Sequence, residues 1–221
     1  MSNEVIVVVA GGDPPDPSSA LAVPLGAPVI AADSGLEHAL ALGLDVAIAV
    51  GDFDSAAPEV VSRAEGSGTR IERHPAEKDA TDLELALDAA LSLGSKRILV
   101  LAGDGGRLDH LLSTLLLLGS SRYEAVEIDA FIGSARAHVV RGECAIEGVL
   151  GELISLFALH GPAEGVRTEG LVYPLAGETL EPGSSRGVSN VFAAETARIS
   201  VESGVLLAVR PSPRTDGAKW L

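Results

Sequence analysis

The chain has 221 residues, of which 47% are hydrophobic, and it carries a formal charge of −15 at pH 7. This length is enough to bury a core in one or two domains, and the hydrophobic content excludes an intrinsically disordered chain. The acidic balance argues against nucleic acid or an anionic membrane as a partner, because both attract basic surfaces.

The first half of the chain alternates apolar runs with helical stripes. Continuous apolar runs, typical of parallel strands buried on both faces, are found at residues 5–10, 29–32, 46–50 and 98–102. Apolar residues at helical spacing follow over 83–91 and over 108–116. Thr81 and Glu84 form a capping-box pattern at the start of the first stripe. Strands that alternate with helices predict a Rossmann-like α/β domain with a mostly parallel, doubly wound sheet.

The second half has a different pattern, since the helical spacing disappears after about residue 138. Short apolar stretches separated by glycines are found at residues 153–157, 188–192, 199–201 and 205–209. Many short strands with glycine turns predict an antiparallel β-sandwich or barrel. We therefore expect an α/β domain over residues 1–135 and an all-β domain over residues 136–221. The polar, proline-rich tail from Pro211 contains Trp220, which we expect to be disordered or to cover an interface.

Acidic side chains gather where the predicted strands end. Asp52 and Asp54 follow the third predicted strand, and alternation around Phe53 is expected to turn both carboxylates to one side. An acidic turn in which Asp accepts backbone amide bonds is the ordinary alternative. Asp33 follows the second predicted strand, where capping of a helix is its default role. Its place at the same edge of the sheet makes it a candidate binding residue.

A second acidic pair, Asp79 and Asp82, opens the first predicted helix. Acidic side chains there stabilise the helix dipole without any further function. A second pair at the same expected sheet edge nevertheless favours a functional site. Lys78 beside them is either a phosphate contact or a solvated neighbour.

A third cluster, Gly105-Gly106-Arg107-Leu108-Asp109-His110, follows the fourth predicted strand. Glycines let the backbone approach an anion, and the Arg107 guanidinium offers paired donors to a phosphate. Asp109 adds a carboxylate or caps the next helix, and His110 is a ligand contact or an ordinary residue at a helix start. Carboxylate oxygens without Cys or His partners are typical of Mg²⁺ sites, in which phosphates share the ion. The three clusters together predict a Mg²⁺-dependent site for phosphoryl groups.

In the second half, Ser189 and Asn190 interrupt an apolar stretch and supply a hydroxyl and an amide that could read a polar ligand. A turn or a sheet edge is the alternative interpretation, and the apolar spacing does not separate the two.

Cys144 is the single cysteine, so neither an intramolecular disulfide nor a thiolate metal cluster is expected. Residues 1–4 lack the basic segment of a secretory signal, and no apolar run reaches the ~18 residues of a membrane-spanning helix. We therefore expect a cytoplasmic protein that does not bind membranes.

Taken in order, these strings resemble the thiamine pyrophosphokinase family over about residues 5–209. The strings that carry the resemblance are A-D-S-G, G-D-F-D-S, K-D-A-T-D-L-E-L-A-L, G-G-R-L-D-H, T-E-G-L-V-Y-P-L and G-V-S-N. The G-D-F-D-S string alone is moderately specific, whereas the ordered series is highly specific. The resemblance implies that the diphosphate of ATP is transferred to the hydroxyl of thiamine, which yields thiamine diphosphate and AMP.

The resemblance also implies an architecture and a set of site residues. It implies a catalytic domain that binds ATP and Mg²⁺, a β-sandwich that binds thiamine, and a homodimer whose active sites are shared between subunits. Arg107 would contact phosphate, and Ser189 and Asn190 would face thiamine. The implied acidic Mg²⁺–ATP site consists of Asp52, Asp54, Asp79, Asp82 and Asp109.

The sequence departs from the family pattern at Ser34, where the A-D-G-G string has its second glycine, and it lacks an Asn near residues 134–138. Aromatic residues are few, and Phe192 is our candidate for stacking on the thiamine ring. Three alternative functions remain: a diphosphokinase for another heterocyclic alcohol such as a pterin, a non-catalytic sensor of thiamine or nucleotide, and a Mg²⁺-dependent phosphohydrolase.

Overall fold

The structure, a computed structural model, describes residues 4–211; the proline-rich tail with Trp220 lies outside these residues apart from Pro211. The chain divides into two compact units, Met1–Ser134 and Ala135–Leu221. We call them the α/β unit and the β unit. Within the described residues, no helix has both the length and the apolar character needed to span a membrane.

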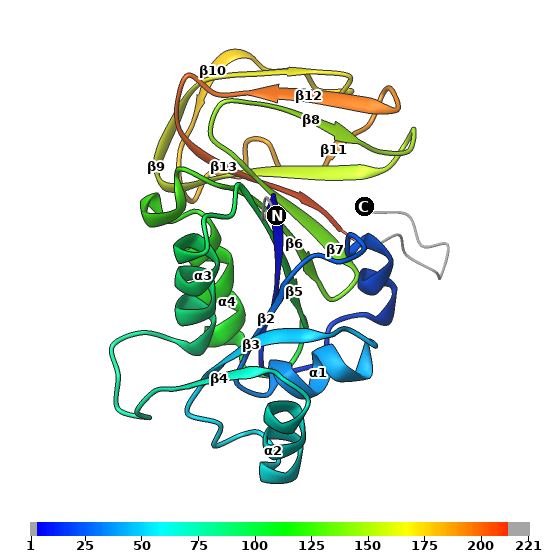
Figure 1. Cartoon of the computed structure of the whole chain (residues 1–221). Helices are drawn as coiled ribbons and strands as arrows, with labels where there is room; N and C mark the ends of the chain where they lie inside the picture. The colour runs from blue at the N-terminus through cyan, green and yellow to red at the C-terminus, as the bar shows by residue number, and fades with distance from the viewer. Residues whose placement is uncertain (1–3, 212–221) are drawn as a thin grey trace. The chain divides into compact units, whose positions relative to one another are not determined.

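The α/β unit is built on a parallel sheet with the strand order β4-β3-β2-β1-β5-β6 (Figure 1). Its strands are β1 (Val5–Val9), β2 (Val29–Ala32), β3 (Val46–Gly51), β4 (Arg70–Arg73), β5 (Arg97–Ala102) and β6 (Glu127–Ile132). The strands β2, β3 and β4 step outward to one side of β1, and β5 and β6 lie on the other side. The order therefore reverses between β1 and β5, where doubly wound sheets open a ligand crevice at their carboxyl edge.

Helices cover both faces of this sheet. They are η1 (Pro17–Ala22), α1 (Gly35–Ala41), α2 (Pro58–Gly66), α3 (Asp82–Ser92), α4 (Leu108–Leu118) and η2 (Ser121–Tyr123). In Figure 1, α3 and α4 lie on one side of the sheet and α1 lies on the other. The predicted doubly wound α/β fold is thus confirmed.

Both helices predicted from apolar spacing form, but they differ in how they pack. Thr81 caps α3, since its Oγ1 accepts a hydrogen bond from the Glu84 backbone N–H at 3.2 Å. The apolar side of α3 (Leu83, Ala86, Leu87 and Ala90) is buried. In α4, by contrast, Leu118 is the one residue that is fully buried, and Leu108, Leu112 and Leu116 are exposed at 77%, 54% and 40%. The i, i+4 row of leucines on α4 therefore faces outward.

The β unit is antiparallel, as predicted, with the strand order β7-β13-β9-β12-β8. Two further strands, β10 and β11, also pair with β9. The strands are β7 (Ala135–Val140), β8 (Glu143–Glu147), β9 (Leu153–Glu169), β10 (Ala176–Leu180), β11 (Asn190–Val191), β12 (Thr196–Ser200) and β13 (Ser203–Arg210). Alternate residues of the 17-residue strand β9 enter the core of this unit, among them Ile154, Leu156 and Val166.

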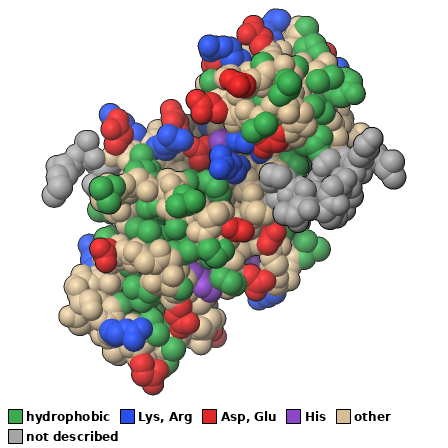
Figure 2. Space-filling view, turned by 90° about the vertical axis from the view of Figure 1, so that its right-hand side faces the viewer, with side chains coloured by type: hydrophobic (Ala, Val, Ile, Leu, Met, Phe, Trp, Pro, Cys, Tyr) green, Lys and Arg blue, Asp and Glu red, His purple; other side chains and the backbone are tan. Residues whose placement is uncertain are grey.

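Charged and apolar side chains share the surface. On the face shown in Figure 2, Asp and Glu side chains are scattered among basic and hydrophobic ones and do not form a single field. On this face no acidic field marks a site, so the local arrangement of carboxylates is what distinguishes one.

Candidate active site

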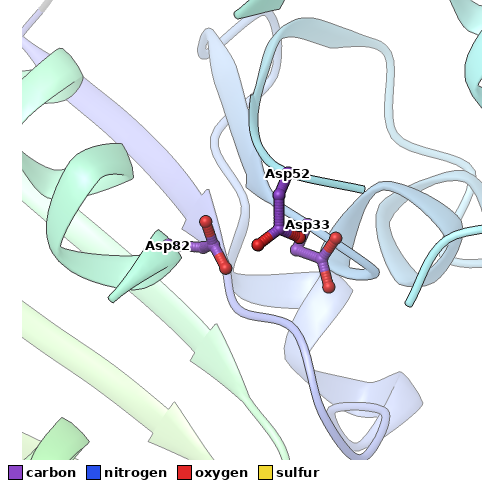
Figure 3. A group of neighbouring side chains, drawn as sticks. All are labelled: Asp33, Asp52 and Asp82. Atoms are coloured by element: carbon purple, nitrogen blue, oxygen red, sulfur yellow. The ribbon is translucent and has the colours of Figure 1, made fainter. Parts of the chain in front are cut away.

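Three aspartates from separate parts of the sequence meet in the α/β unit. Asp33 follows β2, Asp52 follows β3, and Asp82 is the first residue of α3. One carboxylate oxygen of each lies within 4.8 Å of the others. Figure 3 shows Asp82 reaching from α3 towards the other two side chains. Because parallel strands end at a common edge, residues 19 or more positions apart come together here. We call this group the Asp triad.

Asp33 is the most buried member of the Asp triad, with 8% of its surface exposed. Its backbone adopts φ 49°, and its N–H donates to the carbonyl of Val50 at 2.8 Å. Gly51 permits this close approach, since a Cβ at position 51 would lie 3.1 Å from the Asp33 Cα. Burial raises the pKa of Asp33, and the neighbouring carboxylates add to the rise. Within the described residues its Oδ1 is buried and has no hydrogen-bond partner.

Asp52 and Asp82 share a cation. The Lys78 Nζ lies 3.2 Å from Asp52 Oδ2 and 3.0 Å from Asp82 Oδ1. Asp52 Oδ1 also accepts the backbone N–H of Asp54 at 3.1 Å. That N–H, and after it the Lys78 ammonium, lowers the pKa of Asp52. Lys78 was predicted as a phosphate contact or a solvated neighbour, yet its side chain is only 14% exposed and is paired with two carboxylates.

Asp54 and Asp79 lie outside the Asp triad. Phe53 packs inward as expected, but its backbone adopts φ 60°, which interrupts the alternation of an extended strand. Asp54 is accordingly exposed and accepts a hydrogen bond from its neighbour Ser55 at 2.8 Å. Asp79 is exposed in the loop before α3. The structure therefore joins one aspartate from each predicted acidic pair with Asp33.

The third predicted cluster forms its own arrangement after β5. Arg107 Nη2 donates to Asp109 Oδ2 at 2.6 Å, and this hydrogen bond lowers the pKa of Asp109 to about 2. Both side chains are about two-thirds exposed, and His110 is also exposed. The glycines of the cluster serve close packing, since a Cβ at Gly106 would lie 3.1 Å from Asp13 Oδ1 in the loop after β1. This pairing leaves the Arg107 guanidinium at the surface, where an anion can reach it.

Ser34 fills the position at which the sequence departs from A-D-G-G. Its Oγ accepts the backbone N–H of Gly12 at 3.2 Å, and a Cβ at Gly11 would come within 2.9 Å of that same Oγ. On the next turn of α1, His38 Nε2 lies 2.8 Å from the carbonyl oxygen of Gly12. The serine therefore ties the glycine loop after β1 to the start of α1.

In the β unit, Ser189 and Asn190 have different surroundings. Ser189 is exposed with φ 58°, and its N–H donates to Ser155 Oγ at 3.0 Å. Asn190 is 3% exposed. Its amide accepts the backbone N–H of Tyr173 at 3.0 Å and donates to the Tyr173 carbonyl at 2.7 Å. The Asn190 side chain thus holds the backbone of Tyr173, whose own side chain is 61% exposed.

The expectation that Phe192 stacks on a ligand is wrong. Phe192 is 1% exposed and packs beneath Gly148, where a Cβ would lie 2.5 Å from its ring. The guanidinium of Arg210 covers the ring with its central carbon 5.7 Å from the centroid, and Glu152 holds that guanidinium through hydrogen bonds of 2.7–2.9 Å. Apolar spacing alone did not distinguish this core aromatic from an exposed one.

From the sequence, Asp33 ranks below the paired aspartates, and a bridge from Lys78 to two of them is not predicted. The available signal for Asp33 was its position directly after a predicted strand, which it shares with Asp52. No sequence pattern indicated the bridge, because it depends on how the loop between β4 and α3 folds back.

The Asp triad fits a hard divalent cation. It offers carboxylate oxygens only, which is the donor set of Mg²⁺ and Ca²⁺. One of these oxygens, Asp33 Oδ1, is buried without a hydrogen-bond partner among the described residues, which is costly unless a ligand occupies it.

Comparison with known proteins gives a consistent result for both units. Residues 27–130 match the family model "Thiamin pyrophosphokinase, catalytic domain", and residues 141–206 match "Thiamin pyrophosphokinase, vitamin B1 binding domain". A curated relative, the thiamine pyrophosphokinase of Bacillus subtilis strain 168, is 30% identical over 82% of this chain and 86% of its own length.

Solved structures agree with these matches. A crystal structure of thiamine pyrophosphokinase from Bacillus subtilis superposes with a TM-score of 0.82 at 26% identity, covering 95% of this chain and 100% of the other. One from Geobacillus thermodenitrificans superposes with a TM-score of 0.79 at 27% identity, covering 96% and 99%. The likeness therefore extends over both units.

Proposed function

This chain belongs to the thiamine pyrophosphokinase family, and we propose that the Asp triad is where it transfers the diphosphate of ATP to thiamine. The observation that carries this proposal is the convergence of three carboxylates at the carboxyl edge of the parallel sheet, inside the region that matches the catalytic domain. In this assignment the α/β unit is the ATP-binding catalytic domain, and the β unit is the thiamine-binding domain.

We assign Mg²⁺ to the Asp triad, with Asp33, Asp52 and Asp82 as the residues that would hold it. When bound, the ion supplies positive charge that offsets the charge developing on the transferred diphosphate. Asp54, Asp79 and Asp109 remain predicted ligands, and their exposure is compatible with contacts through water. Arg107 remains the predicted phosphate contact, and its exposed guanidinium supports that role.

In the proposed reaction, the hydroxyl oxygen of thiamine forms a bond to the β-phosphorus of ATP. The bond between that phosphorus and the oxygen bridging it to the α-phosphorus breaks, and AMP leaves with that oxygen. A carboxylate oxygen of Asp82 accepts the proton of the hydroxyl. Reactions of this type need positioning and charge neutralisation more than covalent help, which suits a site made of fixed carboxylates and one exposed arginine.

The substrate assignment is tested by product analysis with purified protein, Mg²⁺, ATP and thiamine. We expect AMP and thiamine diphosphate in equal amounts, and no AMP when thiamine is omitted. Free phosphate or diphosphate without a thiamine product would indicate a phosphohydrolase. ATP binding without turnover would indicate a sensor, and turnover with a hydroxymethylpterin alone would indicate a different acceptor.

We also propose that the protein is a homodimer with active sites shared between subunits. The outward row of Leu108, Leu112 and Leu116 on α4 supports an association surface, because exposed apolar patches of this kind mark interaction sites. Light scattering is expected to give a mass of twice the 22.5 kDa of one chain. The Leu112→Glu variant is expected to shift that mass towards one chain, because a charge would be buried in the interface.

Leu21 offers the matched control for this substitution, since it is 90% exposed and belongs to η1, a different element from α4. Leu21→Glu is expected to leave the mass unchanged. A single-chain mass for the unmodified protein at micromolar concentration would contradict the homodimer itself, whereas a Leu112→Glu dimer would place its interface elsewhere.

A further inference from the structure

Lys78 lies against the Asp triad, whereas a lysine that binds phosphate would extend its ammonium towards the ligand. It lies in the loop between β4 and α3, and its side chain is 14% exposed. Its Nζ contacts Asp52 Oδ2 at 3.2 Å and Asp82 Oδ1 at 3.0 Å, and these carboxylates are themselves only 16% and 25% exposed. The ammonium therefore points towards the carboxylates and not into solvent.

The charges of this group explain why a cation lies there. Three carboxylates whose oxygens are within 4.8 Å of one another repel unless positive charge is placed among them. Lys78 donates a hydrogen bond to Asp52 and forms an ion pair with Asp82. Asp82 Oδ1 and Asp33 Oδ1 are both buried without a hydrogen-bond partner among the described residues. One positive charge thus holds two of three carboxylates, and the group keeps a net negative charge that favours a further cation.

We propose that Lys78 is the resident counterion of the Asp triad and that a divalent cation takes its place. An ion held by Asp52 and Asp82 would contact carboxylates that the ammonium now contacts. Two cations beside the same carboxylates repel, so binding of the ion requires the ammonium to withdraw. The Lys78 side chain then leaves its ion pairs with Asp52 and Asp82 and faces the ligand bound with the divalent cation.

This inference rests on the proposed assignment of the Asp triad as the cation site. It concerns two quantities, the stability of the metal-free protein and the affinity of the site for the ion. Without metal, Lys78 stabilises the protein because it joins β3 and α3 through Asp52 and Asp82. When the ion binds, displacement of the lysine makes the net free energy of ion binding less favourable. Removal of the lysine should therefore weaken the metal-free protein and strengthen its binding of the ion.

The test measures Mn²⁺ binding without nucleotide by electron paramagnetic resonance of the free ion. The unmodified protein is compared with Lys78→Met, which keeps the length of the side chain and removes its charge. We expect Lys78→Met to bind Mn²⁺ about tenfold more tightly, since a like charge next to the ion has been removed. We also expect a lower melting temperature without metal and a larger rise of that temperature on adding Mn²⁺.

Lys96 provides the matched control, because it is an exposed lysine of the same unit that lies before β5, whereas Asp33 and Asp52 lie after the carboxyl ends of β2 and β3. Lys96→Met is expected to bind Mn²⁺ as the unmodified protein does. If the unmodified protein binds Mn²⁺ and Lys78→Met binds it equally or more weakly, the exchange is overturned while the cation site stands. If no protein binds Mn²⁺, the cation site itself fails.

Lys78→Gln is measured in parallel, because its amide still donates a hydrogen bond without carrying charge. Should both variants unfold without metal, millimolar Mn²⁺ is expected to refold them, since the ion supplies the missing positive charge. Failure of Mn²⁺ to restore their circular dichroism would overturn the exchange.

Discussion

Asp82→Ala is expected to lower kcat for thiamine diphosphate formation by about 10²–10³-fold, which is the range for loss of a proton acceptor or of a group that stabilises developing charge. Asp82 is the member of the Asp triad that α3 presents directly, and its first-turn position fixes the carboxylate against Asp52 and Asp33. Substitution removes an oxygen donor for the ion and the acceptor of the thiamine proton together. The rate is measured by chromatography of AMP and thiamine diphosphate.

Glu84→Ala separates this effect from loss of an acidic residue at a helix start. Glu84 lies in the same first turn of α3 and outside the Asp triad, and it contributes similarly to the helix dipole. Its removal is expected to leave kcat within about twofold of the value for the unmodified protein, because the interaction with the helix dipole affects helix stability and is small. Near-normal turnover by Asp82→Ala with unchanged circular dichroism would remove Asp82 from the proposed mechanism.

Gly35→Ala is expected to produce the largest loss of stability from a single methyl group in the α/β unit. A Cβ at position 35 would overlap the carbonyl oxygen of Val9 and lie 2.9 Å from the carbonyl carbon of Ala10. Both are backbone atoms at the end of the central strand β1, so a change of side-chain rotamer cannot relieve the overlap. We expect the free energy of unfolding to fall by about 2–3 kcal/mol, as for other cases of overpacking, in urea denaturation.

The matched control is Gly66→Ala at the end of α2. No atom lies within 4 Å of a Cβ built there, and the backbone of Gly66 does not require positive φ. This substitution is expected to raise the free energy of unfolding by about 0.5 kcal/mol, because alanine restricts the unfolded chain. Equal stabilities for the two variants would show that β1 and α1 can move apart without loss.

The strands of the parallel sheet that were predicted from the sequence are those buried on both faces. β1, β2, β3 and β5 were found because a central parallel strand is apolar on both faces. β4 was missed because it lies at the sheet edge and reads Arg-Ile-Glu-Arg, a pattern without a continuous apolar run. β6 was missed for a related reason, since charged residues alternate with its buried ones.

The location of the candidate site was predictable, whereas its membership was not. Strand ends of a parallel sheet meet at one edge, and this rule placed Asp33 and Asp52 near each other. Which carboxylate of each pair turns inward depends on single backbone angles, such as the φ of 60° at Phe53, which no local spacing encodes. The same holds for Lys78, whose partners are set by the path of a loop.

The pairing of β9 has a consequence for synthesis of the chain on the ribosome. β8 and β9 leave the ribosome early within the β unit, yet the strands with which they pair, β10 to β13, lie in residues 176–210. The parallel sheet of the α/β unit is complete once residue 132 has emerged. The 17-residue strand β9, by contrast, keeps unpaired backbone groups until its partner strands in residues 176–210 have been made. Nascent chains therefore pass through a stage at which β9 is open to intermolecular pairing, and this stage ends when β13 has emerged.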